Sequence, residues 1–147
     1  MSQRFSGRAV LPGNLEGEAV VSHAGFNAYA SFYDSLHDGA TEAVCADSGN
    51  KEVFGKRLDG KIVCLPKTTG STSAGAVWTR LAKLRIAPKA VLFSQQIDPL
   101  AAGGLIAVDQ WGGMRIVTID QLGDAFLQAV KSGDRLSIQE DGTVLID

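Results

Sequence analysis

Hydroxyl-bearing side chains are concentrated in one short segment of the chain, just before a helical pattern. An apolar run from Ile62 to Leu65 precedes the segment, and apolar residues recur at helical spacing from Ala74 onward. The start of a helix presents unpaired backbone N–H groups and the positive end of the helix dipole. The segment is therefore suited to bind a carboxylate or phosphate, or to stabilise a serine alkoxide. Its five hydroxyls surround Gly70 and belong to Thr68, Thr69, Ser71, Thr72 and Ser73.

The residues alone leave a simpler interpretation open, in which one hydroxyl caps the helix and the others decorate a loop. A nucleotide-binding P-loop is improbable, because no lysine follows Gly75 as the GxxxxGK[ST] motif requires. A serine nucleophile would need a histidine base. His23 and His37 are the only histidines, and sequence alone pairs neither of them with Ser71.

The elements that position this segment form a βαβ unit. The pattern predicts a strand over 61–65, a helix over about 72–84 and a strand over 90–93. Two such strands are expected to be parallel, with a right-handed crossover. We therefore predict an α/β fold, organised as a single domain over residues 1–147.

Further strands are expected on either side of this unit. Residues 8–11 and 17–21 have strand character and are separated by the turn Pro12-Gly13-Asn14. Residues 22–60 contain scattered glycines and no sustained period, which indicates a mostly irregular segment with a short strand near Ala43. A C-terminal β-hairpin is predicted around Asp141-Gly142.

Two more helices follow the βαβ unit. Asp98 and Pro99 are a helix cap and a first helical residue, and this helix is expected to run to about Val108. Its Gly103-Gly104 pair indicates close packing against a neighbour. After a strand over 115–118, Asp120 is predicted to cap a helix that ends at Gly133.

Composition excludes several classes of partner. The net charge is −2 with both signs interspersed, so no basic stripe favours nucleic acid. No apolar run approaches the roughly 18 residues that a membrane span needs, and we expect a cytoplasmic protein. Cys45 and Cys64 are the only cysteines and form no CxxC pair, so no metal site is expected in this chain. Cys64 is expected to be a buried apolar residue, whereas the role of Cys45 stays open.

Residues 72–80 resemble the swivelling phosphohistidine domains of phosphoenolpyruvate-utilising enzymes, whose signature reads T-S-H-x-A-I-x-A-R. This chain has Thr72-Ser73-Ala74 at the start of the signature. Ala74 occupies the position of the phosphate-accepting histidine, and alanine cannot accept a phosphoryl group. The resemblance therefore implies a shared architecture without that activity.

Nearly the whole sequence resembles the small subunit, or swivel domain, of the aconitase X family. The family fold is a swivelling β/β/α domain that packs on a large subunit, and the pair dehydrates a small hydroxy acid. The resemblance places an iron or iron–sulfur centre on the large subunit, as a Lewis acid for the leaving hydroxyl. The matching landmarks are Gly17–Ser22, Leu58–Val63, Leu65-Pro66, Gly70–Gly75, Ala87–Leu92 and Asp98–Gly104.

The resemblance also gives the hydroxyl-rich segment a role in removing a proton next to a carboxylate. Carried over by position, the base is Ser71, with Ser73 in reserve. A serine alkoxide would depend on the helix N-terminus, nearby N–H donors and exclusion of solvent. The expected substrate-binding residues are Thr69, Gly70, Thr72, Ser73 and Asn27. Lys67 and Arg80 are candidate carboxylate ligands, with solvated or interface charges as the alternative.

The expected substrate depends on residues 25–32. Archaeal members that resemble mevalonate-5-phosphate dehydratases carry an S-F-W-G-G type segment, whereas this chain has Gly25-Phe26-Asn27-Ala28-Tyr29-Ala30-Ser31-Phe32. This departure favours the branch that resembles cis-3-hydroxy-L-proline dehydratase, which would form a pyrroline-2-carboxylate. Mevalonate-5-phosphate dehydration is the alternative within the class. A non-catalytic, anion-binding swivel module is the alternative from another class.

Overall fold

A mixed sheet is the centre of the molecule in the computed structural model, which describes residues 2–70 and 74–147. The strands are β1 (Gln3–Ser6), β2 (Arg8–Leu11), β3 (Leu15–Val21), β5 (Ile62–Leu65), β7 (Ala90–Phe93), β8 (Val117–Asp120), β9 (Arg135–Ile138) and β10 (Thr143–Ile146). Within the described residues they form an eight-stranded sheet in the order β1-β10-β9-β3-β5-β7-β8-β2. This mixed α/β architecture confirms the predicted fold class.

Strand β3 joins two parts of this sheet. Its first half, from Leu15 to Glu18, pairs antiparallel with β9, and its second half, from Ala19 to Val21, pairs parallel with β5. Strands β5, β7 and β8 continue the parallel part, and β2 closes it as an antiparallel edge. The antiparallel part contains the predicted C-terminal hairpin, β9 and β10. The predicted βαβ unit and hairpin are both confirmed.

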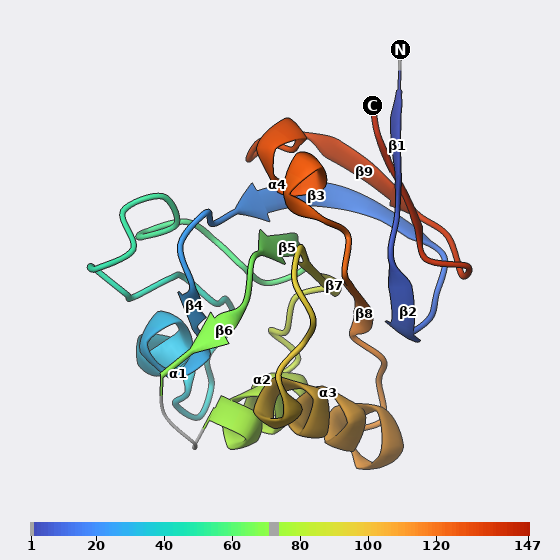
Figure 1. Cartoon of the computed structure of the whole chain (residues 1–147). Helices are drawn as coiled ribbons and strands as arrows, with labels where there is room; N and C mark the ends of the chain where they lie inside the picture. Colours follow the sequence, from blue (N-terminus) through green and yellow to red (C-terminus); the bar gives the residue numbers. More distant parts are fainter. Residues whose placement is uncertain (1, 71–73) are drawn as a thin grey trace.

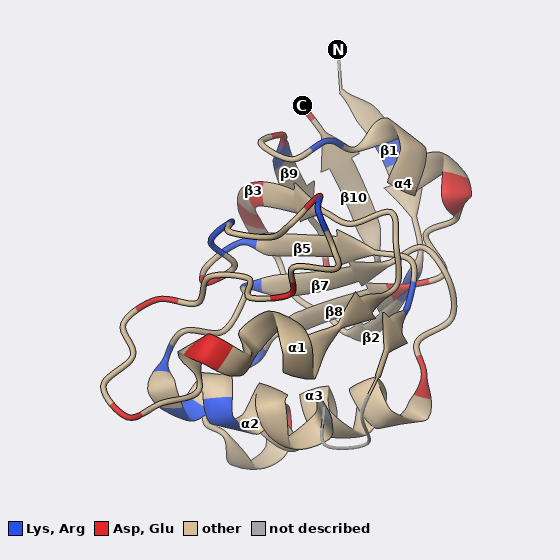
Figure 2. Ribbon diagram, turned by 90° about the vertical axis from the view of Figure 1, so that its left-hand side faces the viewer, with Lys and Arg blue, Asp and Glu red and all other residues tan. Residues whose placement is uncertain are grey.

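The helices are α1 (Ala28–Phe32), α2 (Ala74–Leu84), α3 (Pro99–Trp111) and α4 (Asp124–Ala129), with a 3₁₀ helix η1 (Tyr33–Ser35) after α1. Helices α1, α2 and α3 cover one side of strands β5, β7 and β8, and α4 lies beside β3 and β9 on the other (Figure 1). Figure 2 shows the first group as a layer along the sheet. We call the two sides the helix face and the hairpin face.

Alternation along the buried strands divides the core between these two faces. In β5, Val63 and Leu65 point into a cluster with Trp78 and Leu105 on the helix face. Ile62 and Cys64 point into a second cluster with Phe126 on the hairpin face. All four residues of β5 are buried, as expected for a parallel strand that is covered on both sides.

Several predicted boundaries are corrected by the structure. Residues 22–60 contain the short strand β4 (Phe26–Asn27), α1 and η1 as well as loop, and near Ala43 there is only an isolated bridge between Val44 and Arg57. Helix α3 continues to Trp111 instead of ending near Val108, and β8 begins two residues later than predicted. The first residues of the predicted 72–84 helix lie outside the described range.

The prediction that Asp120 caps a helix is wrong. Asp120 is the last residue of β8, and α4 begins at Asp124 after Gly123. The buried carboxylate accepts two hydrogen bonds from Arg8, at 2.9 and 2.7 Å, and one from the backbone N of Ile97 at 2.8 Å. Asp120 therefore ties the edge strand β2 to the loop that leads into α3.

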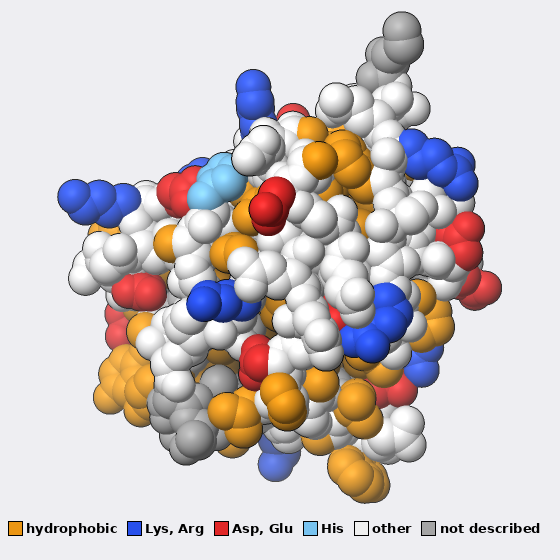
Figure 3. Space-filling model, viewed as in Figure 1, with side chains coloured by type: hydrophobic (Ala, Val, Ile, Leu, Met, Phe, Trp, Pro, Cys, Tyr) orange, Lys and Arg blue, Asp and Glu red, His pale blue; other side chains and the backbone are white. Residues whose placement is uncertain are grey.

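Hydrophobic side chains reach the surface mainly over the helix layer. In Figure 3 they gather along the lower part of the view, over α1 and α3. Within the described residues, no helix is long and apolar enough to cross a membrane.

Candidate active site

The hydroxyl-rich segment begins on a short second sheet. Strand β6 (Thr68–Thr69) pairs parallel with β4 (Phe26–Asn27), in the register Phe26 to Thr68 and Asn27 to Thr69. The backbone N of Phe26 also donates to the carbonyl oxygen of Lys67 at 2.9 Å. These bonds hold the chain between the end of β5 and the start of α2.

Gly70 is required at the end of this small sheet. Its φ of +99° lies in the left-handed region, and a Cβ at this position would lie 2.4 Å from Nδ2 of Asn27. The Asn27 side chain in turn accepts a hydrogen bond from the backbone N of Ala30 at 3.0 Å and so caps α1. The structure therefore brings together Asn27, Thr69 and Gly70, three of the predicted substrate-binding residues, while their role in binding stays a prediction.

Ser71, Thr72 and Ser73 lie outside the described residues. Their predicted roles, with Ser71 as base and Thr72 and Ser73 as substrate contacts, are therefore untested by the geometry. The described chain resumes at Ala74, the first residue of α2. The described residues on either side of positions 71–73 are Gly70 and Ala74.

Asp98 is a polar residue of this region that sequence reasoning identified only as a helix cap. One carboxylate oxygen accepts from the Thr68 hydroxyl, and the other accepts from the backbone N of Ala101 at 2.9 Å. Asp98 therefore links the start of α3 directly to β6. In the sequence, the Asp-Pro pair indicates only a helix start and does not indicate the contact with Thr68.

Close contact between two glycines fixes the start of α2 against α3. A Cβ at Gly104 would lie 2.8 Å from Cα of Gly75 and 2.9 Å from its carbonyl oxygen. Only glycine allows the two helices to approach this closely. The predicted close packing of the Gly103-Gly104 pair is confirmed at Gly104, whereas a Cβ at Gly103 would meet no atom within 4 Å.

Arg80 and His37, two further candidates, make their contacts away from this region. Arg80 donates to the carbonyl oxygen of Leu36 at 3.2 Å and pairs with Asp38, whose pKa its hydrogen bond lowers. This engagement favours the structural alternative for Arg80 over a carboxylate ligand. Lys67 is exposed immediately before β6. His37 contacts the carbonyl oxygen of Asp38 through Nδ1 at 3.1 Å.

His23 connects the irregular segment to α4. Its Nδ1 lies 2.6 Å from Oε2 of Glu52, and its Nε2 lies 3.1 Å from the carbonyl oxygen of Leu127. The hydrogen bond to Glu52 raises the pKa of His23, because the charged ring can donate to both acceptors. Both ring nitrogens of His23 therefore have partners within the chain, which indicates a structural role.

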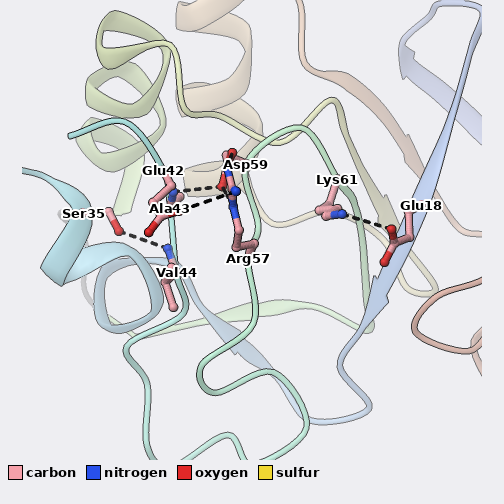
Figure 4. Close-up of polar contacts among 8 residues, drawn as sticks. All are labelled: Glu18, Ser35, Glu42, Ala43, Val44, Arg57, Asp59 and Lys61. Atoms are coloured by element: carbon pink, nitrogen blue, oxygen red, sulfur yellow. Dashed lines mark hydrogen bonds and ion pairs between the residues drawn. The ribbon is translucent and has the colours of Figure 1, made fainter. Parts of the chain in front are cut away.

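A pocket beside β3 is lined by three basic residues, two of which pair with carboxylates of this chain. Lys61 pairs with Glu18 at 3.0 Å, and Arg57 pairs with Asp59 and, at 3.5 Å, with Glu42 (Figure 4). Partial burial disfavours the charged Asp59, but hydrogen bonds from Arg57 and the Ala43 N outweigh it and lower its pKa. The Arg57 pairs connect parts of the irregular segment with one another, and the Lys61 pair connects the start of β5 to β3. The pocket is lined by Glu18, Ala19, Val20, Lys56, Arg57, Lys61, Ser132 and Gly133.

The described residues do not fit a metal centre. Among residues 2–70 and 74–147, no group of three His, Cys, Asp or Glu side chains could hold a metal ion. Cys45 belongs to the helix-face core and Cys64 to the hairpin-face core. Burial raises the pKa of both thiols, which disfavours the thiolate that a metal would need.

Comparison with known proteins gives one family over almost the full length. Residues 4–146 match the family described as the aconitase X swivel domain. The phosphomevalonate dehydratase small subunit of Archaeoglobus fulgidus is 31% identical over 138 residues, which cover 94% of this chain and 93% of that protein. The corresponding protein of Thermococcus onnurineus is 28% identical, with the same coverage of 94% and 93%.

Solved structures agree with this result. The crystal structure of Thermococcus kodakaraensis aconitase X in its holo form superposes with a TM-score of 0.82 at 25% identity, and covers 99% of this chain and 98% of that one. A solution NMR structure of a UPF0107 protein gives a TM-score of 0.74 at 26% identity, with 97% of each chain covered. The predicted resemblance is thereby confirmed. The names of the relatives match the alternative substrate, and they do not support the preferred hydroxyproline.

Proposed function

Because the chain belongs to the aconitase X swivel-domain family, we propose that it is the small subunit of a cytoplasmic, two-subunit hydro-lyase acting on mevalonate 5-phosphate. The observation that carries this proposal is the full-length similarity to dehydratase small subunits, which spans 94% of the chain in the Archaeoglobus protein. The partner would be an aconitase X large subunit. By the family resemblance, an iron or iron–sulfur centre would lie on that subunit and act as the Lewis acid for the leaving hydroxyl.

In this proposal Ser71 takes a proton from the carbon next to the substrate carboxylate, and the C–H electron pair forms the double bond. The neighbouring carbon loses hydroxide, which becomes water with the proton that Ser71 releases to restore its base form. The hydroxyl of Ser71 is a weak base in water, so its alkoxide has to be stabilised. Helix α2 begins three residues later and is 11 residues long, so its N-terminal dipole supports negative charge there. Gly70 and Asn27 would contact the substrate from the other end of the segment.

A second substrate, cis-3-hydroxy-L-proline, is favoured by one local observation. The segment in which this chain departs from the S-F-W-G-G type is residues 25–32, and its first residues adjoin the candidate site. A Cβ at Gly25 would lie 2.5 Å from Cγ2 of Thr69, and Asn27 contacts Gly70. The departure therefore falls where it would change contacts with a substrate.

One assay separates these possibilities. The chain would be co-expressed with its cognate large subunit, and the purified pair would be incubated with each substrate while loss of water is followed by mass spectrometry. We expect dehydration of mevalonate 5-phosphate by the pair and none by either subunit alone. If the pair dehydrates only cis-3-hydroxy-L-proline, that compound becomes the substrate in place of mevalonate 5-phosphate. Full activity of the isolated chain would contradict the two-subunit proposal, and an assembled pair that only binds anions would support the non-catalytic alternative.

A further inference from the structure

Two adjoining cavities lie where helices α2 and α3 end, and the proposed dehydration makes no use of them. The larger has a volume of about 400 Å³ and is lined by Ala82, Arg85, Ala87, Gly112, Gly113 and Met114. The smaller, of about 230 Å³, shares Gly112 with it and is otherwise lined by Thr79, Lys83 and Trp111. Helix α2 has 11 residues, so its two ends lie about 15 Å apart. The cavities are therefore separate from the candidate site at the start of α2.

The loop after α3 has the backbone conformation of an anion-binding nest. Gly112 is right-handed, with φ −85° and ψ −7°, and Gly113 is left-handed, with φ +75°. This succession turns consecutive N–H groups toward one concavity. The N–H group of Gly112 donates to the carbonyl oxygen of Val108, whereas those of Gly113 and Met114 have no acceptor among the described residues. Two N–H donors at the larger cavity are therefore able to bind an anion.

Arg85 lines the larger cavity in a backbone conformation that arginine rarely adopts. Its φ is +62°, in the left-handed region. Its backbone N donates to the carbonyl oxygen of Ala82 at 3.1 Å, and the N of Ile86 donates to that of Leu81 at 3.0 Å. These two bonds form the C-terminal cap in which this position is usually glycine. A strained arginine where glycine would fit without strain indicates a function for the guanidinium group.

The charge at this end of the helix layer is positive. Lys83 and Arg85 are exposed, and neither forms an ion pair with another described residue. Asp38 is paired with Arg80, and Asp109 on α3 is paired with Arg115. The C-terminal ends of α2 and α3 each carry about half a negative charge, so the two cations leave roughly one positive charge over. An anion is therefore favoured in spite of the helix dipoles.

Trp111 gives the smaller cavity an exposed aromatic wall. Its side chain is 84% exposed, the largest value among the exposed large hydrophobic side chains of the described residues. Nucleic-acid bases stack on exposed aromatic side chains of this kind, whatever the base. Lys83 lines the same cavity, and Arg85 lines the adjoining one. A stacking surface beside positive charge indicates a ligand that has both a planar ring and an anionic group.

We propose that the two cavities together bind a nucleoside phosphate. The base stacks on Trp111, and the phosphate binds to Arg85 and to the N–H groups of Gly113 and Met114. The planar guanidinium group matches the oxygens of a phosphate, and Lys83 adds a second positive charge. A single nucleotide needs only these local cations, whereas a nucleic acid needs the basic stripe that the sequence lacks. The site does not depend on the proposed dehydratase function, because none of its residues takes part in that reaction.

The test measures binding of three probes to the purified full chain by isothermal titration calorimetry. The probes are ADP, pyrophosphate as the anion alone, and adenosine as the ring alone. We expect ADP to bind at least about fivefold more tightly than pyrophosphate, which is the smallest usual contribution of one stacked base. Adenosine is expected to bind more weakly than ADP. Trp78 is fully buried and is the only other tryptophan, so quenching of the exposed tryptophan emission by ADP locates the base at Trp111.

Two variants separate the ring from the phosphate. Arg85→Gln is expected to weaken both ADP and pyrophosphate at least about tenfold, since it removes hydrogen bonds to a charged group. Trp111→Leu is expected to weaken ADP about fivefold or more and to leave pyrophosphate within about twofold of wild type. The matched control is Arg135→Gln, which removes an exposed arginine from β9 and should leave both affinities unchanged.

Arg85→Gly separates binding from folding. Glycine adopts the left-handed conformation without strain, so this variant should melt at or above the wild-type temperature while it binds ADP as weakly as Arg85→Gln. Wild-type ADP affinity in Arg85→Gly would overturn the proposal, and so would the absence of ADP binding to the wild-type chain at millimolar concentration. Equal weakening by Arg135→Gln would show an effect of net charge alone and would also overturn it. Equal affinities for ADP and pyrophosphate would contradict a nucleoside phosphate as the ligand.

Discussion

The helix face and the hairpin face each bury an apolar core, but they end in different surfaces. Among the described residues, the hairpin-face elements α4, β9 and β10 expose no large hydrophobic side chain. All the exposed ones lie on α1, η1, α3 or the irregular segment, namely Tyr29, Tyr33, Phe54, Leu100, Ile106 and Trp111. The helix face carries the candidate site and an apolar surface beside it, which is the distribution expected of a subunit with one binding side.

The largest effect on stability is expected at Asp120, which connects the edge strand β2 to the loop before α3. Asp120→Ala removes a buried carboxylate and leaves the backbone N of Ile97 without its acceptor. We expect a loss of about 2–4 kcal/mol in the free energy of unfolding, measured in urea. Arg8→Gln is the matched control. Arg8 is exposed, so its replacement should cost less, and an equal loss in both variants would contradict this asymmetry.

The packing of the helix face is tested by a pair of neighbouring glycines. Gly104→Ala forces a Cβ to within 2.8 Å of Cα of Gly75, so α2 and α3 have to separate. We expect this variant to lose about 1–3 kcal/mol in thermal or urea unfolding. Gly103→Ala meets no neighbour within 4 Å and should gain up to about 1 kcal/mol from helix propensity. Two variants of equal stability would show that the close approach does not matter.

Asp98 is expected to have a smaller effect on stability and a separate effect on activity. Asp98→Ala removes the cap of α3 and should cost about 1 kcal/mol. It also releases Thr68, so turnover of the assembled enzyme should fall while KM changes less. Asp98→Asn keeps an acceptor for the Ala101 N and should behave nearly as wild type. Unchanged turnover in Asp98→Ala would mean that the link to Thr68 does not position the site.

The smallest effect concerns His23 and Glu52, which connect the irregular segment of the helix face to α4 of the hairpin face. The Glu52 hydrogen bond raises the pKa of His23 above 6.5 in the folded chain. The stability that charged His23 contributes is therefore fully present below pH 6.5 and is lost as pH rises through the folded pKa. Partial burial opposes ionisation of Glu52, but hydrogen bonds with His23 lower its pKa below 4.5, so its contribution is lost as pH falls through that lower value.

His23→Gln should therefore destabilise the chain most near pH 5.5, by under about 1 kcal/mol because the pair is exposed, and least near pH 9. The measurement is the difference in urea midpoint between the variant and wild type across this range. His37→Gln is the control and should show no such pH dependence. If His23→Gln destabilised the chain more near pH 9 than near pH 5.5, the charged pair would not be the source of the stability.

The sequence predicts the βαβ unit well because its strands are continuous apolar runs and α2 has a clear helical period. It misses α1, which has only five residues and begins with Asn27, a residue typical of turns. Asp120 is misassigned because an aspartate shortly before a helical pattern also has the signature of a cap. Its partners, Arg8 and Ile97, come from distant parts of the chain and leave no local signal.

The candidate site is likewise predictable only where its features are local in the sequence. The hydroxyl-rich segment and the glycines are local features, and the family resemblance indicates which serine to choose. The contact between Thr68 and Asp98 joins residues 30 positions apart, so only the fold reveals it.

The central claim, that a serine of this chain acts at a site completed by another subunit, is tested most directly by turnover of Ser71→Ala in the assembled pair. Ser73→Ala serves as the control, and sedimentation confirms that both variants assemble. With saturating substrate we expect Ser71→Ala to reduce kcat by about 10²–10⁴-fold, the usual contribution of a general base, while Ser73→Ala retains most activity. Wild-type turnover by assembled Ser71→Ala would contradict the assignment of Ser71 as the base.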